Sequence, residues 1–234
     1  MDGEIKEDFN AYFQVALASS VVLFGFDGNQ LLIYIQNKIT KQHRDFKILP
    51  STYVLPDRSN ELEIRKLIAK HLEKDDLYLE QLKAFHHVFR NPKGRVVNIA
   101  FYALIKLDDE IIKKTKELNG AWVPYNLIPD LAFDHNDIIV YAKERLKRRF
   151  KRRPVGFNLL PKEFTLTELQ LLYESALGKE MDKRNFRKKI FKSQLIVPSG
   201  NKTEPEQTRK AAKLYSFDED TYQKMTLKGY DFLF

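Results

Sequence analysis

The chain contains no cysteine among its 234 residues. Disulfide bonds, thiolate catalysis and metal sites built on cysteine are therefore excluded. The sequence also has no apolar run near the roughly 18 residues that span a bilayer as a helix. Its acidic first residues lack the apolar core of a secretory signal peptide. These absences predict a cytoplasmic protein that makes no membrane contact.

Acidic residues are scarce in the last third of the chain. The formal charge is +8 overall, and residues 151–234 contribute +6 of it, with 17 basic and 11 acidic residues. Ten basic and two acidic residues lie between Lys183 and Lys213. Such dense positive charge favours a polyanionic partner, bound with an affinity that falls as salt rises. A second basic run, 143–153, fits either a phosphate-contacting surface or a solvated helix end that complements the helix dipole.

Residues 164–217 have the pattern of a helix-turn-helix followed by a two-stranded wing. Thr165 and Glu168 are spaced as a capping box, which predicts that a helix begins at about Leu166. Gly178 stands where a left-handed C-terminal cap is expected. The first helix should therefore end there.

The second helix of this pattern is the predicted recognition helix. Asp182 can cap its first turn, and Phe186 and Ile190 share one apolar face. Its other faces carry the residue types best suited to reading guanine and adenine edges or gripping phosphate. These predicted DNA contacts are Lys183, Arg184, Asn185, Arg187 and Lys188.

Two short apolar segments, 195–197 and 214–217, are the predicted strands of the wing. The loop between them is polar and basic, so it can lie along a phosphate backbone. The predicted backbone contacts in this loop are Lys202, Arg209 and Lys210.

The first 150 residues mix strand and helix patterns, which argues for an α+β domain with a largely antiparallel or mixed sheet. Pro154 breaks the last helix, and we place a domain boundary there, giving domains 1–153 and 154–234. The predicted strands are 15–26 and 31–35 around the turn 27–30, 81–89, 95–105 and 121–123. The predicted helices are 61–72, 108–118 and 135–150.

Several segments of the chain form a recognisable combination when they are taken together. They are Val54, Asp57, the helix 61–72, the hairpin 91–95, Trp122-Val123, Phe133-Asp134-His135 and the strings GFNLLPKEFTLTELQLLYE and DKRNFRKK. This combination resembles the Nudix-related transcriptional regulators of the NrtR and AraR group, over about residues 13–217. The resemblance implies a Nudix-like mixed-sheet domain that binds a small effector. It also implies a C-terminal winged helix-turn-helix domain that binds double-stranded operator DNA as a homodimer.

A Nudix hydrolase stacks carboxylates on one helix face to hold Mg²⁺ against a pyrophosphate. Aligned with that pattern, this chain has other residues at the acidic positions, namely Arg58, Leu67, Lys70 and His71. Glu61 and Glu63 cannot substitute, because residues two apart point about 200° apart around a helix. They are expected to pair with Arg65 and Lys66 at the surface. We therefore predict that the chain is not an enzyme and uses no metal or cofactor.

The effector should be a small metabolite bound by the first domain. The family responds to ligands as different as ADP-ribose and pentose sugars, and the C-terminal strings favour the sugar-responsive branch, with arabinose or xylose as first candidates. Four residues around the hairpin or at the start of the last helix are the predicted effector contacts: Arg90, Arg95, Asn98 and His135.

Other polar residues receive structural interpretations. Asp134 is expected to be a helix N-cap. His86 and His87 are adjacent on a predicted strand and should face opposite sides, one packed and one exposed, so they cannot chelate one metal ion together.

The leading interpretation is a ligand-responsive transcriptional regulator with a catalytically inactive Nudix-like domain. The alternative is a divergent Nudix-type phosphohydrolase with an appended nucleic-acid-binding module. A third possibility is an RNA-binding adaptor, which predicts a preference for single-stranded RNA over duplex DNA.

Overall fold

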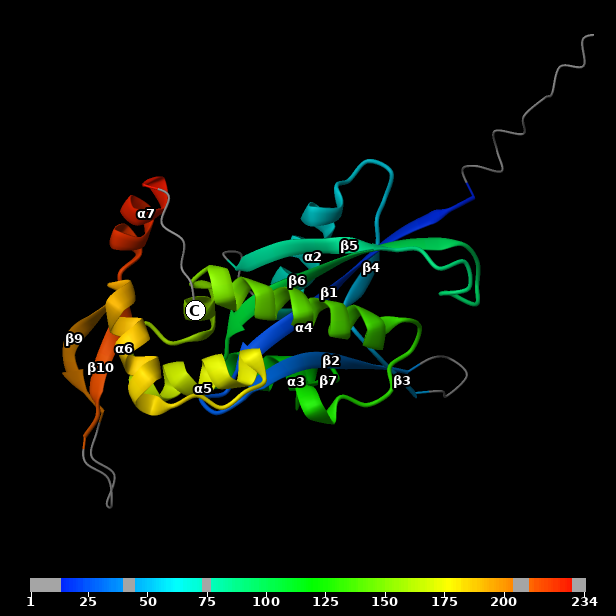
Figure 1. Ribbon diagram of the computed structural model, residues 1–234. Coiled ribbons are helices and arrows are strands. Elements are labelled where there is room, and N and C mark those ends of the chain that lie inside the picture. The colour runs from blue at the N-terminus through cyan, green and yellow to red at the C-terminus, as the bar shows by residue number, and fades with distance from the viewer. Residues whose placement is uncertain (1–13, 40–44, 73–76, 204–210, 229–234) are drawn as a thin grey trace, which may run out of the picture.

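A mixed β-sheet with helices on both faces forms the N-terminal part of the protein in the computed structural model, which describes residues 14–39, 45–72, 77–203 and 211–228 (Figure 1). The sheet has seven strands in the order β3-β2-β1-β6-β5, with β4 paired to β1 and β7 paired to β2. β1 and β6 are parallel, and the other pairs are antiparallel. The predicted mixed sheet is confirmed. The strands are β1 Ala16–Phe26, β2 Leu31–Ile39, β3 Asp45–Ile48, β4 Ser51–Tyr53, β5 Tyr78–Phe85, β6 Val96–Lys106 and β7 Gly120–Pro124.

The predicted hairpin between β1 and β2 is confirmed, and its turn follows from the residues in it. The Asp27 carboxylate accepts hydrogen bonds from the main-chain amides of Asn29 at 2.9 Å and Gln30 at 2.7 Å. Gly28 adopts a left-handed φ of 91°, which glycine reaches at little cost. The turn is therefore encoded locally.

Each face of the sheet has its own apolar core, because alternate residues of β1 point to opposite sides. Val21 and Leu23 pack with the helices α2 (Asn60–Leu72) and α3 (Asp109–Glu117). Val22 and Phe24 face the helix α4 (His135–Arg152). Figure 1 shows α4 lying along the sheet on the side opposite to α2 and α3. A strand buried on both faces explains the near-continuous apolar sequence of β1.

The C-terminal part is a helix-turn-helix with a three-stranded sheet in the order β8-β10-β9. The predicted wing strands correspond to β9 and β10, which pair in antiparallel fashion. Its elements are η2 Val155–Leu159, β8 Phe164–Thr165, α5 Leu166–Leu177, α6 Lys183–Ser193, β9 Ile196–Lys202, β10 Lys213–Phe217 and α7 Glu219–Leu227. A short 3₁₀ turn, η1 Tyr125–Leu127, precedes α4.

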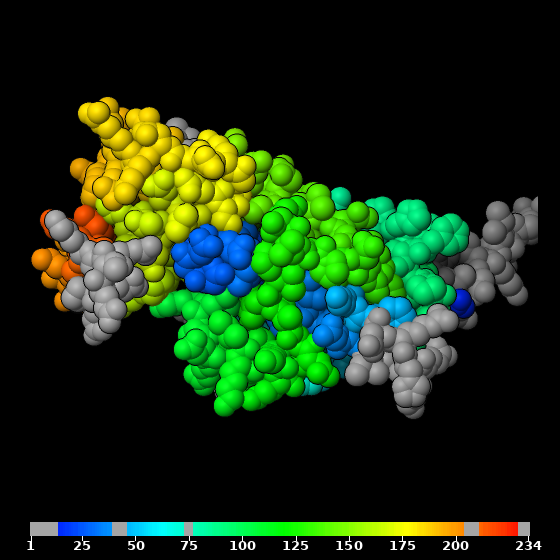
Figure 2. Space-filling model, turned by 90° about the horizontal axis from the view of Figure 1, so that it is seen from below, coloured from blue at the N-terminus to red at the C-terminus, as the bar shows by residue number. Residues whose placement is uncertain are grey.

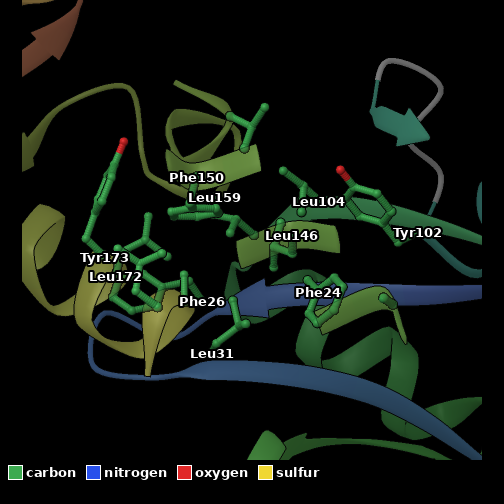
Figure 3. Packing of buried hydrophobic residues seen from close by; sticks show 14 of the residues in the cluster. Phe24, Phe26, Leu31, Tyr102, Leu104, Leu146, Phe150, Leu159, Leu172 and Tyr173 are labelled. Atoms are coloured by element: carbon green, nitrogen blue, oxygen red, sulfur yellow. The ribbon is translucent and has the colours of Figure 1, made fainter. Parts of the chain in front are cut away.

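The core on the α4 side continues into the helix-turn-helix. Phe26 and Leu31 at the ends of β1 and β2, Phe150 of α4, and Leu172 and Tyr173 of α5 belong to one buried cluster (Figure 3). The Phe150 and Tyr173 rings meet edge to face with centroids 5.1 Å apart. The boundary at Pro154 stays a prediction, and shared apolar packing joins the segments on its two sides.

Strand β5 differs from its predicted span of 81–89, since it begins at Tyr78 and ends at Phe85. Its register against β6 shifts between Gln81 and Ala84. His86 and His87 lie beyond the strand and are both exposed, so the expectation that one of them is packed was wrong.

The strands β3, β4 and β8 and the helix α7 were not predicted. The strands have four, three and two residues, too few to show a period. Helix α7 buries none of its residues fully, so its apolar face is weak. In the part of the chain that the structure describes, no helix is long and apolar enough to cross a membrane.

Candidate nucleic-acid interface and effector site

The capping box at the start of α5 is confirmed. The Thr165 side chain accepts from the Glu168 amide at 3.1 Å, and the Glu168 carboxylate accepts from the Thr165 amide at 2.7 Å. Gly178 caps the other end with a left-handed φ of 67°. The limits of α5 are thus set by local chemistry, as the sequence predicts.

A polar clamp fixes the turn between α5 and α6. The Glu174 carboxylate accepts from the Met181 amide at 2.8 Å and from the Gln170 side chain at 2.9 Å. Gln170 also donates to the Met181 carbonyl at 2.9 Å. This clamp sets the direction in which α6 leaves the turn, and sequence reasoning missed it. Its signal was the pair Gln170 and Glu174, four residues apart on one helix face.

Helix α6 has the two faces expected of a recognition helix. The Asp182 side chain accepts from the Asn185 amide at 2.8 Å and caps the first turn. Phe186 and Ile190 are buried, and the Phe186 ring meets Tyr173 of α5 edge to face at 5.8 Å. The residues predicted to contact DNA all lie exposed on the remaining surface: Lys183, Arg184, Asn185, Arg187 and Lys188.

The charges of four cations on this surface have no carboxylate partner among the residues that the structure describes. Within the described part of the chain, no ion pair engages Lys183, Arg184, Arg187 or Lys188. In Figure 2 the yellow side chains of α5 and α6 stand out at one end of the molecule. An exposed cationic helix anchored by buried aromatic and aliphatic residues suits the major groove of DNA.

The wing adds positive charge beside this helix. Lys202 ends β9, is exposed, and lies directly across from Lys213 of β10. Like charges placed opposite each other on paired strands repel, so a phosphate between them would relieve that repulsion. The other predicted wing contacts, Arg209 and Lys210, lie outside the described residues.

The predicted effector residue Arg90 forms an internal ion pair. Its guanidinium donates to the two oxygens of Asp134 at 2.9 and 2.6 Å, and the two side chains are only 5% and 16% exposed. Asp134 does occupy the N-cap position of α4, but its side chain makes no capping hydrogen bond. The expected capping role of that carboxylate was wrong, because the carboxylate binds Arg90 instead.

His135 and Asn98, also predicted to contact the effector, are buried and hydrogen-bonded within the protein. His135 Nδ1 accepts from the Leu49 amide at 3.0 Å, and burial lowers the pKa of this histidine to about 4. Asn98 donates to the Ser20 hydroxyl at 2.8 Å. A ligand could reach these groups only after they exchange their internal partners.

Arg95, the fourth predicted effector residue, lines a cleft. Its guanidinium donates to the His86 carbonyl at 2.8 Å. The Lys83 ammonium lies over the Tyr141 ring, 4.5 Å from its centroid. Cations beside aromatic rings suit an anionic ligand with an apolar part. The cleft has a volume of about 410 Å³ and is lined by Lys83, Ala84, Phe85, His86, His87, Val88 and Arg95.

Helix α2, which corresponds to the Nudix helix, carries surface ion pairs in place of stacked carboxylates. Glu61 pairs with Arg65 at 2.8 Å and Glu63 with Lys66 at 3.5 Å, as expected. Arg58 also binds Glu63, at 3.2 Å. Among the residues that the structure describes, no group of three or more histidine, aspartate or glutamate side chains is placed to hold a metal ion.

His71, at one acidic position of the Nudix pattern, turns inward. Its Nδ1 lies 2.7 Å from the Leu67 carbonyl oxygen and its Nε2 lies 2.6 Å from the Gln36 amide nitrogen. Burial lowers the pKa of His71, which favours the neutral ring. This side chain is thus occupied with packing α2 on the sheet.

Known proteins are similar to this chain in both sequence and fold. Residues 156–217 match the NrtR DNA-binding winged helix domain. An ADPR-responsive transcriptional repressor from Acinetobacter baylyi is 30% identical over 223 residues, covering 92% of this chain and 83% of the relative. NrtR from Shewanella oneidensis, solved with a 27-mer DNA, is 27% identical with a TM-score of 0.73, over 88% of this chain and 95% of that one.

A protein of lower sequence identity has a similar fold. A MutT/nudix family protein from Enterococcus faecalis superposes with a TM-score of 0.65 at 21% identity, over 87% of this chain and 86% of that one. The confirmed winged helix, the Nudix-like sheet and the identity to a curated repressor lead to one assignment. The chain belongs to the NrtR family of Nudix-related transcriptional regulators.

Proposed function

We propose that this protein is a transcriptional repressor that places α6 in the major groove of operator DNA and the β9–β10 wing along the backbone. The observation that carries the proposal is the exposed cationic face of α6, which no carboxylate of the described chain neutralises, above a buried anchor of Phe186 and Ile190. The relatives support it, because one is a repressor and another was solved with DNA. Residues 154–234 are the DNA-binding part in this proposal.

We propose ADP-ribose as the effector, bound within residues 1–153. The Acinetobacter baylyi relative is responsive to ADPR. The relatives described above give no support to arabinose or xylose, which the C-terminal strings favoured. In the cleft beside Arg95, the cations of Lys83 and Arg95 can meet a pyrophosphate, while Phe85 and Val88 offer apolar surface. Arg90, Asn98 and His135 would take part only if ligand binding opened their internal bonds.

The protein acts as a sensor without turnover in this proposal, and it binds DNA as a homodimer. The positions where a hydrolase needs carboxylates hold other residues, namely Arg58, which pairs with Glu63, and Leu67, Lys70 and the buried His71. Two copies of α6 reading a palindromic site would match the two-fold symmetry of such an operator. Light scattering of the purified protein, alone and with operator, measures the stoichiometry, and one protein chain per operator contradicts the dimer.

Operator binding is tested with full-length protein and duplex fragments of its own promoter. Arg184→Ala and Arg187→Ala should each weaken binding by about 1 to 3 kcal/mol, or about 5- to 150-fold. Lys113→Ala is the matched control, since it removes one exposed cation from α3 and should leave binding unchanged. If the arginine variants fold normally and bind the operator like wild type, the assignment of α6 is wrong. Preference for single-stranded RNA would favour the adaptor instead.

The effector is tested by calorimetry with ADP-ribose, arabinose and xylose. ADP-ribose at 100 times its dissociation constant should stabilise the fold by about 2.7 kcal/mol. Arg95→Ala should weaken its binding, and Lys93→Ala, an exposed cation of the same hairpin, should not. Release of products from ADP-ribose with Mg²⁺ at about 1 per second or faster would contradict the sensor and favour the hydrolase.

A further inference from the structure

Ser175, near the C-terminal end of α5, is held by two hydrogen bonds from the sheet domain. The amide of Leu31, the first residue of β2, donates to the Ser175 hydroxyl at 2.8 Å. The Lys143 ammonium of α4 donates to the Ser175 main-chain carbonyl at 2.8 Å. Figure 2 shows the blue β1–β2 turn lying against the yellow surface of α5. Because α6 packs on α5 through Phe186 and Tyr173, whatever fixes α5 also places the recognition helix.

Lys143 is an unusual residue for this position, because only 9% of it is exposed. Its ammonium meets the Ser175 carbonyl and the Tyr125 ring, whose centroid is 4.8 Å away. Among the described residues it forms no ion pair. Burying an ammonium without a carboxylate partner costs free energy, and an apolar side chain of the same length would avoid that cost. The same ammonium satisfies the Ser175 carbonyl, which lies in the last turn of α5 where helix carbonyls lack intrahelical partners, and it does so through a directional contact between the two helices.

Helix α4 links this contact to the effector cleft. At its N-terminus, Asp134 binds Arg90, which belongs to the segment between β5 and β6. That segment also supplies His86, His87 and Val88 to the cleft. At the other end of α4, Arg149 binds Glu80 of β5 at 2.7 Å. A single helix of 18 residues thus runs from the cleft segment to the side of α5 (Figure 1).

Apolar side chains also pack between α4 and α5. Leu146 and Phe150 of α4 pack with Leu172 and Tyr173 of α5 in the buried cluster (Figure 3). Apolar packing is non-directional, so it holds the two helices together while tolerating small shifts between them. Hydrogen bonds depend on distance and angle and therefore fix a single register. The two bonds to Ser175 supply that register.

We propose that Lys143 and Ser175 form the coupling contact through which effector binding in the sheet domain repositions the winged helix. A shift of α4 or of the β1–β2 turn is passed to α5 by these two bonds and reaches α6 through Tyr173 and Phe186. Without the bonds, α5 would slip over its apolar contacts and the shift would be lost. This inference rests on the proposed function, because it assigns the route by which ADP-ribose acts on operator binding.

The test compares operator affinity with and without saturating ADP-ribose in full-length variants. Lys143→Met keeps the length and apolar contacts of the side chain and removes the donor, and Ser175→Ala removes the acceptor of the Leu31 amide. In the wild-type protein, the operator affinities measured with and without ADP-ribose should differ by a factor of about 5 to 150. Each variant should reduce this ratio at least about threefold, and the double variant should bring it close to one.

Two controls separate coupling from general damage. Lys147→Met makes the same substitution one turn along α4, where the lysine is partly exposed and pairs with Glu144, and should keep the wild-type ratio. Ser175→Thr retains the hydroxyl and should restore the coupling. ADP-ribose affinity measured without DNA should change by less than about twofold in every variant, because none of these residues touches the cleft.

The outcomes are distinguishable. Folded Lys143→Met and Ser175→Ala proteins that keep the full wild-type ratio would overturn the inference and leave the proposed function standing. A wild-type protein that binds operator but ignores ADP-ribose would overturn both the proposed effector and the coupling. Should Lys143→Met fail to fold, the pair Ser175→Ala and Ser175→Thr decides the question, since the two variants differ chiefly in the hydroxyl.

Discussion

Acidification should destabilise this protein through His135. The side chain is 3% exposed, and its Nδ1 accepts a hydrogen bond from the Leu49 amide at 3.0 Å, which requires that nitrogen to be unprotonated. Burial lowers the pKa of His135 to about 4, with Asp134 raising it and Arg90 lowering it further. In the unfolded chain the ordinary pKa of 6.5 applies. The unfolded state therefore binds the proton more tightly.

The size of the effect follows from these two pKa values. Above about pH 6.5 neutral His135 does not reduce the free energy of unfolding. As the pH falls towards 4, the free energy of unfolding decreases, because only the unfolded state takes up a proton on His135 in that interval. A difference of about 2.5 pKa units corresponds to about 3 kcal/mol in total. About 2 kcal/mol of that should be lost between pH 7 and pH 5.

The assay is urea unfolding of the wild type and of His135→Asn at several pH values between 7 and 5. Asparagine can still offer an acceptor to the Leu49 amide and does not titrate. The stability difference between the two proteins should therefore shift by about 2 kcal/mol in favour of the variant on going from pH 7 to pH 5. If both proteins lose stability in parallel over this range, His135 is not the group responsible and the reasoning fails.

Three further predictions concern single positions. Thr165→Ala removes one side of the capping box and should lower the free energy of unfolding by about 1 kcal/mol, so an unchanged urea midpoint would show that the cap contributes nothing. Lys202→Ala should weaken binding to operator and scrambled duplexes alike and lower the salt slope by about one unit, and a loss confined to the operator would instead indicate a base contact. Gly120→Ala would place a Cβ 2.1 Å from the buried Tyr34 ring and should lower the free energy of unfolding by about 1 to 3 kcal/mol in thermal unfolding, and an unchanged melting temperature would show that the ring moves aside at no cost.

The sequence by itself determined the features whose causes lie within a few residues of one another. The capping box of Thr165 and Glu168, the left-handed Gly178 and the turn after Asp27 each depend on side chains that bind their own neighbouring backbone. The two faces of α6 follow from helical periodicity alone. The ion pairs of Glu61 with Arg65 and of Glu63 with Lys66 join residues four and three positions apart, so they are local as well.

Only the tertiary structure decided which polar residues form hydrogen bonds and ion pairs inside the protein. Arg90 meets Asp134 across 44 positions, Asn98 meets Ser20 across 78, and Leu31 meets Ser175 across 144. No local pattern marks such partners, because a buried polar group takes whichever complementary group the packed chain brings within reach. The strands β3 and β4 are likewise too short to carry a period and form only because β2 and β1 offer them an edge. Sequence thus determined the exposed cationic face of α6, and long-range packing determined the internal polar contacts of the sheet and its junction with α5.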